Sequence, residues 1–183
     1  MQIAELKAGN AYILCICEGT AEEEIINLLL DNDKLIFTRE DLIDCKLIRT
    51  RKAEKIQEDY LNFAFEKPLV ILRVLDSKSE GFKLGKAYQE RFQDRIINII
   101  TSPEIEILMI IHKGDYSKYT NKRKSKMKPS EFCKIEYGLP GIKRGGMVRE
   151  FFGGVDALVN SINEYARVTK TEGYTLKDLI EGE

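Results

Sequence analysis

The chain has 183 residues, with 30 acidic against 29 basic side chains, so its net charge of -1 leaves room only for a local nucleic-acid surface. Hydrophobic residues at 43% and charged residues at 32% are ordinary for a soluble globular protein and argue against global disorder. The four cysteines have neither zinc-ligand spacing nor the density of a disulfide framework, and no apolar run is long enough to span a bilayer. We therefore expect a cytoplasmic single-domain protein with reduced thiols.

Apolar runs and helical periodicities alternate along the sequence, which is typical of an α/β protein. In chain order the pattern predicts strands at 11–17, 45–50, 69–75 and 105–111, which alternate with helices at 21–30, 53–65 and 82–100. No hairpin signal separates these strands, so we expect four parallel strands covered by helices, with right-handed crossovers. A last long helix is predicted at 155–168. The single domain 1–183 thus divides into an α/β core at 11–112 and an extension at 113–183, which consists of a basic loop and helices.

Charged residues follow the predicted strands at their carboxyl ends. Glu18 and Asp76 come directly after the first and third strands, a basic cluster at 49–52 closes the second, and His112 follows the fourth. Because these ends share one edge of a parallel sheet, we expect the side chains to converge there. Carboxylates from two strand ends suit Mg²⁺ or Mn²⁺, and such ions activate water in phosphodiester cleavage. Each acid could instead only begin the helix that follows it, since carboxylates favour a first helical turn.

Two residues of the fourth predicted strand bear on the same site. Glu106 lies within an apolar run, and a buried carboxylate without a partner is costly, so a metal, an arginine or protonation must relieve it. If Glu106 lies at the exposed start of the strand, it needs no function. His112 is the only histidine of the chain, and it could be a general base, a phosphate contact or a purely structural residue.

The sequence resembles a known family in the order of these features. A strand, the pattern Glu-Gly-x-x-Glu at 18–22, a helix, a strand, a helix and a strand that ends in Asp76 resemble the TOPRIM domain of topoisomerases, bacterial primases and OLD-type and RloB-like nucleases. The stretch 102–112 is similar to the RloB-like pattern of proline, two residues, glutamate, a hydrophobic strand and histidine, with Pro103, Glu106 and His112 at matching positions. The resemblance covers roughly 11–135 and implies a TOPRIM, Rossmann-like fold.

The resemblance also implies roles for these residues. Glu18 and Asp76 would bind Mg²⁺, and Glu106 and His112 would belong to the same catalytic site, with Glu106 as a further metal ligand or base. TOPRIM domains usually carry Asp-x-Asp after the third strand, whereas this chain has Lys78 at the second position. Lys78 would contact phosphate, and Glu80 is the remaining candidate for the second metal-binding carboxylate. The departure keeps a degenerate, noncatalytic family member as an alternative.

A basic segment follows the predicted core. The stretch 113–128 contains seven lysine or arginine residues against one acid. Clustered cations bind phosphates through counterion release, so Arg49, Arg51, Lys122, Arg123 and Lys124 are candidate contacts to DNA or RNA. A solvated loop would explain the same composition.

Together these features predict a metal-dependent nuclease or a related phosphodiester or nucleotidyl enzyme that acts on DNA or RNA. The resemblance to RloB-like and OLD-type proteins further implies bacterial or phage defence alongside an ATPase partner protein. A homodimer is a further expectation, and a membrane partner is not expected. The alternatives are a noncatalytic module that binds nucleic acid or a protein partner, and an enzyme of small-molecule phosphates.

Overall fold

The computed structural model of the protein describes residues 3–76, 81–122, 127–139 and 146–182. Within these residues an open parallel sheet has three strands in the order β1 (Tyr12–Cys17), β2 (Leu69–Leu75) and β3 (Ile96–Ile100). The helices around it are α1 (Thr20–Leu30), α2 (Ala53–Ile56), α3 (Lys86–Phe92), α4 (Ile107–His112), α5 (Tyr116–Lys122), α6 (Pro129–Tyr137), α7 (Met147–Phe152) and α8 (Val155–Val168). Short 3₁₀ or π turns are η1 (Ile3–Leu6), η2 (Arg39–Asp41), η3 (Ile43–Cys45), η4 (Gln57–Leu61), η5 (Gln93–Arg95) and η7 (Leu176–Leu179). The chain is an α/β protein, as predicted.

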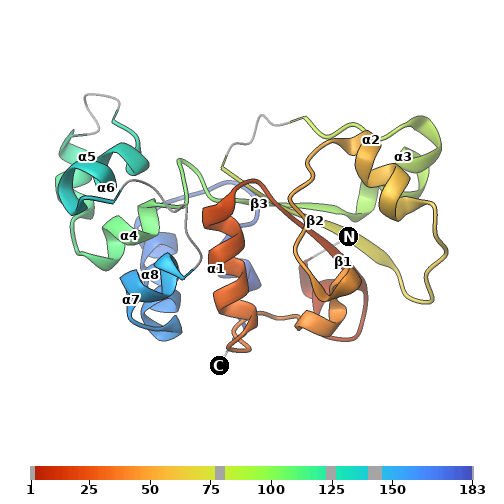
Figure 1. The fold of residues 1–183 in the computed structure, drawn as a ribbon, viewed down its shortest axis with the longest axis horizontal. Helices are drawn as coiled ribbons and strands as arrows, with labels where there is room; N and C mark the ends of the chain where they lie inside the picture. The colour runs from red at the N-terminus through yellow and green to blue at the C-terminus, as the bar shows by residue number, and fades with distance from the viewer. Residues whose placement is uncertain (1–2, 77–80, 123–126, 140–145, 183) are drawn as a thin grey trace.

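Strands β1 and β2 are buried on both faces, which explains why they are apolar apart from the buried Arg73. Successive side chains of β2 alternate between two hydrophobic clusters. Val70 and Leu72 belong to the larger cluster, which α1, α4, α7 and α8 complete, and Ile71 belongs to the smaller one beneath α2 and α3. Figure 1 shows α4 to α8 on one side of the sheet, beyond α1, and α2 and α3 on the other.

The parallel register brings the carboxyl ends of the strands to one edge. Cys17 lies opposite Val74, and Leu75 lies opposite Ile100. The residues that follow the three strands therefore start side by side, and in open α/β sheets ligands bind at this edge.

The predicted second strand at 45–50 is reduced to one parallel bridge between Ile48 and Ile16. Asp44 and Cys45, just before it, have φ angles of 55° and 52°, so the backbone turns where an extended strand was expected. The pairing nevertheless holds the basic cluster at 49–52 next to the carboxyl end of β1. The helix predicted at 53–65 is also shorter, because α2 passes into the π turn η4 and regular structure ends at Leu61.

Two predictions at 82–111 are wrong. The helix predicted at 82–100 is the short α3 followed by β3, and the strand predicted at 105–111 is the helix α4. The isoleucines of this stretch, Ile96, Ile97, Ile99 and Ile100, fit a helical stripe, but they are β-branched and form the strand that pairs with β2 on the side opposite β1. The run in α4 is buried all round, and such a run carries no periodicity that separates a strand from a helix. The sheet therefore has three strands where four were expected.

The C-terminal segment completes the fold. Helix α8 occupies the predicted range, and the chain then returns to the sheet, where Tyr174 bridges Ile99 and its carbonyl accepts the N–H of Ile100 at 2.8 Å. Further on, Ile180 forms an antiparallel bridge with Leu35. The tail thus pairs with β3 through the bridge at Tyr174, outside the three strands of the sheet. None of the helices in the described parts of the chain is both long and apolar enough to cross a membrane.

Candidate functional site

Carboxylates gather in a cavity of about 270 Å³ at the carboxyl edge of the sheet, which we call the acid pocket. It lies between the start of α1, the end of β2 and the segment that leads into α4. Its lining residues are Gly19, Thr20, Ala21, Glu22, Asp76, Glu104, Glu106 and Ser130. Glu18, which directly follows β1, lies beside the acid pocket and accepts the backbone N–H of Asp76. Four acids in one small cavity are unusual, because like charges at short range destabilise each other.

Glu18 is held in place by two partners. Its Oε1 pairs with Nη1 of Arg51 at 2.8 Å, and its Oε2 accepts the backbone N–H of Asp76 at 3.0 Å. The second bond follows from the sheet register, since β1 and β2 end at the same level. Glu18 therefore ties the two strand ends together and brings a guanidinium to the edge of the acid pocket.

Glu22 carries the clearest electrostatic signature of the site. Its side chain lies in the first turn of α1 and is only 7% exposed. Burial, together with the charges of Glu106, Glu18 and Asp76, raises its pKa to about 7. A Cβ atom on Gly19 would lie 2.9 Å from Oε2 of Glu22, so the absence of a side chain at Gly19 leaves the space that this carboxylate occupies.

Asp76 and Glu106 complete the group of perturbed acids. Burial and the nearby Glu18 raise the pKa of Asp76, which directly follows β2. Burial and the charges of Glu104 and Asp76 raise the pKa of Glu106. Glu106 was expected inside a buried strand, but it immediately precedes α4 and is half-buried at the pocket wall. Acids that repel each other at a strand edge are typical of a site that accepts a cation or a proton.

Glu104 links the acid pocket to the basic part of the chain. Its Oε2 accepts the backbone N–H of Ser130 in the first turn of α6 at 2.9 Å, and its Oε1 lies 3.5 Å from Nζ of Lys128. The carboxylate thus satisfies a free amide at the helix start, where a negative charge is stabilising. This contact places α6 directly beside the acids.

The structure does not bring His112 into the acid pocket. His112 ends α4, whereas Glu106 precedes it, so the two side chains lie at opposite ends of that helix. The ring centroid of His112 is 5.0 Å from that of Phe152 and 5.7 Å from that of Phe151. Burial and the adjacent Lys113 lower its pKa, which favours the neutral imidazole.

The candidate phosphate contacts are placed unevenly. Arg51 is at the pocket rim, and Arg49 is bonded to the start of α1, with Nη2 donating to Oγ1 of Thr20 at 3.0 Å and Nε 3.5 Å from Glu23. The remaining phosphate-contact candidates, Lys78, Arg123, Lys124 and the side chain of Lys122, lie outside the described residues, as does Glu80, the candidate for a further metal-binding carboxylate.

Sequence reasoning passed over two acids of the pocket, Glu22 and Glu104. Neither was named as a site residue: Glu22 entered only as the second glutamate of the Glu-Gly-x-x-Glu pattern and as part of the acidic start of a helix, and Glu104 only as a neighbour of Glu106. The available signal was the pair Glu18 and Glu22, because acids on both sides of a strand-to-helix turn can face one cavity. Glu104 gave no such signal, since its role depends on a contact with Ser130 far along the chain.

The donor chemistry of the acid pocket fits a hard divalent cation, because every side-chain ligand it offers is an oxygen and the carboxylates repel each other. Among the described residues, however, no three His, Cys, Asp or Glu side chains are grouped closely enough to form a metal site in their present positions. Comparison with protein families, curated proteins and solved structures gives no match to this chain.

Proposed function

We propose that this protein is a metal-dependent phosphodiesterase, a nuclease or a related nucleotidyl enzyme, which acts on DNA or RNA in the acid pocket. One observation carries the proposal. Glu22, Asp76 and Glu106 come from three different elements, line one cavity at the carboxyl edge of a parallel sheet, and all have raised pKa values. Acids that serve structure alone are paired with cations, whereas these are held against each other at a cost in stability, which is expected of a binding site.

The roles follow from position. Asp76, Glu22 and Glu106 would hold Mg²⁺ or Mn²⁺, with Glu18 positioned beside them by the Asp76 amide and Arg51. Such an ion supplies charge neutralisation and an activated water. Arg51 and Lys128 lie at the rim, where their charges would bind a phosphate group of the substrate. Glu104 positions Lys128 and α6 and is not needed as a ligand.

The TOPRIM assignment belongs to the same proposal. It is supported by a parallel α/β sheet in which Glu18 follows β1 and Asp76 follows β2. A role in bacterial or phage defence with an ATPase partner comes with the RloB-like and OLD-type resemblance. Where that resemblance expects a strand the chain forms the helix α4, which separates Glu106 from His112.

A noncatalytic nucleic-acid or protein-binding module is the second candidate. The ion pairs Arg51–Glu18 and Lys128–Glu104 favour it, because cations of the chain itself then take the place of a metal. In that case the basic rim would bind phosphates and the acids would only hold the rim in position.

Calorimetric titration with Mg²⁺ and Mn²⁺ separates the two candidates. It compares the wild type with Asp76→Asn, Glu22→Gln and the exposed Glu54→Gln on α2 as a matched control, each also assayed for cleavage of single-stranded and duplex DNA and RNA. We expect binding and cleavage in the wild type and the control, and loss of both in the two pocket variants. A folded wild type that binds nucleic acid without metal and cleaves nothing would overturn the proposal and support the noncatalytic module.

A further inference from the structure

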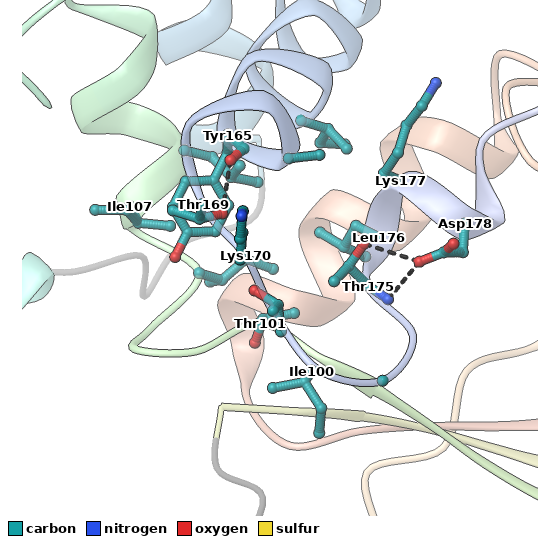
Figure 2. Close-up of a pocket in the computed structure, with 16 residues that line it drawn as sticks. Ile100, Thr101, Ile107, Tyr165, Thr169, Lys170, Thr175, Leu176, Lys177 and Asp178 are labelled. Atoms are coloured by element: carbon teal, nitrogen blue, oxygen red, sulfur yellow. Dashed lines mark hydrogen bonds between the residues drawn. The ribbon is translucent and has the colours of Figure 1, made fainter.

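A second cavity, of about 380 Å³, lies beyond the carboxyl end of β3, and we call it the apolar cavity. It is enclosed by the end of β3, the first turn of α4, the second half of α8 and the segment at 169–178 that returns to the sheet. Figure 2 shows Ile100, Ile107 and Leu176 around it, with Tyr165 and Thr169 from the end of α8. It shares no lining residue with the acid pocket, and the proposed function makes no use of it. Its volume is within the range of small-molecule sites.

The floor of the apolar cavity is hydrocarbon. Ile107, Leu108, Ile162 and Leu176 are each at most 5% exposed and belong to the larger hydrophobic cluster. A void lined by such side chains forfeits the dispersion contacts that a filled core would make, so an apolar molecule that fills it gains both contacts and burial.

Several polar groups at the mouth are already bonded within the protein. Oγ1 of Thr169 donates to the carbonyl of Tyr165 at 2.7 Å, and the carboxylate of Asp178 accepts the N–H and the hydroxyl of Thr175 at 2.7 and 2.9 Å. Lys170, which also lines the cavity, makes no ion pair with a described residue. Figure 2 shows Lys170 among the lining side chains, whereas Lys177 extends away from them. Two lysines therefore border the cavity, and Lys170 is the one whose side chain stays with the other lining residues above the apolar floor.

We propose that the apolar cavity binds a small amphipathic monocarboxylate, an aliphatic chain of medium length whose carboxylate pairs with Lys170. One ammonium group matches one carboxylate. A phosphate would call for more donors than the mouth provides, because anion sites for phosphate combine several amides or a guanidinium. A neutral molecule would leave Lys170 without a role. This inference does not depend on the acid pocket or on its reaction.

Octanoate and octan-1-ol are matched probes, since they share the chain and differ in charge. Calorimetry at neutral pH would compare the wild type with Lys170→Ala and with the control Lys177→Ala, since Lys177 also borders the cavity but its side chain extends away from the others. We expect octanoate to bind about tenfold more tightly than octan-1-ol, because a hydrogen bond to a charged group is worth more than one to a hydroxyl. Lys170→Ala should remove that preference and Lys177→Ala should keep it. Equal affinity for the two probes, or equal loss in the two variants, would overturn the role of Lys170.

A substitution that fills the apolar cavity tests whether the probes bind there. Ala166→Leu places three further carbon atoms into the space, and we expect it to weaken both probes, with circular dichroism and thermal unfolding to confirm that the variant is folded. In the wild type, affinity should rise about fourfold for each CH₂ from butanoate upward until the chain fills the cavity, which corresponds to the burial of one methylene. Failure of the wild type to bind octanoate, or unchanged binding in folded Ala166→Leu, would refute the proposal.

Discussion

The acid pocket and the apolar cavity lie at the same edge of one sheet, yet they are built on opposite principles. The acid pocket brings Glu22, Asp76 and Glu106 close together and raises their pKa values. These carboxylates therefore repel each other until a cation or protons neutralise them. The apolar cavity has a floor of well-buried aliphatic side chains, with Lys170 among its lining residues. The acid pocket therefore depends on charge alone, whereas the apolar cavity depends on the fit of an aliphatic chain together with the charge of Lys170, so different changes should disable them.

The largest effect is expected from Asp76→Asn. Loss of a carboxylate that neutralises phosphate charge through a metal should lower metal-dependent cleavage by about a hundredfold or more, because such stabilisation amounts to several kcal/mol. Octanoate affinity should be unchanged in the same protein. Cleavage rates at saturating Mg²⁺ and octanoate calorimetry measure the two sites separately, and a parallel loss of both would contradict their independence.

Glu22→Gln should stabilise the fold, and by an amount that depends on pH. The pKa of Glu22 is about 7 in the folded chain against an ordinary 4.5, so between these values the folded state binds a proton that the unfolded state has released. Wild-type stability therefore falls as pH rises through this window, and glutamine removes the loss. We expect the variant to gain up to about 3 kcal/mol above pH 7 and nothing below about pH 4. Urea unfolding at pH 4, 6 and 8 tests this, and a gain that does not change with pH would contradict it.

Ile162→Ala should destabilise the protein by about 2 kcal/mol, the lower end for a buried aliphatic truncation. Ile162 borders the apolar cavity, so it already lacks neighbours on one side. Ile26, fully buried in α1 and not a lining residue of either cavity, is the matched comparison, and Ile26→Ala should cost more. Chemical denaturation of the two variants ranks them, and an equal or larger loss at Ile162 would argue that the apolar cavity is filled in solution.

Gly19→Ala should have the smallest effect on stability, within about 0.5 kcal/mol, because Gly19 has an extended backbone that alanine adopts freely. The new Cβ would nevertheless meet Oε2 of Glu22 at 2.9 Å, and the flexible carboxylate must move away. We expect the Glu22 pKa to fall toward its ordinary value as the group leaves the buried position. A carboxyl-detected NMR titration measures this, and an unchanged pKa would show that the pocket tolerates the extra carbon.

The sequence predicted the elements that local signals define. The strand ends at Cys17 and Leu75 were visible because an apolar run stops at an acid, and the structure places Glu18 and Asp76 beside each other there. The stretch predicted as the strand around Glu106 is the helix α4. Glu106 nevertheless lies in the acid pocket, because it directly precedes the buried run whether that run is a strand or a helix. His112, which was predicted to belong to the same site, does not lie there, because a helix and a strand with the same number of residues place their last residue at different positions.

What the sequence did not predict depends on contacts between distant segments. The choice between strand and helix at Ile96–Ile100 was made by pairing with β2, and the site of Glu104 by the amide of Ser130. The apolar cavity was equally invisible, because its walls come from four separate parts of the chain. Local patterns cannot report such arrangements, and tertiary context overrides local preference in each case.

The return of the C-terminal segment to the sheet has a consequence for how the protein is made. The carbonyl of Leu179 accepts the N–H of Ile36 at 2.9 Å, and Leu179 is fully buried in the larger cluster. On the ribosome, the region around Leu35 is synthesised before the segment around Leu179. The part of the core that these two segments share therefore stays open until the second segment has emerged. Closing it requires a contact between two segments far apart in the sequence, and such non-local contacts slow folding.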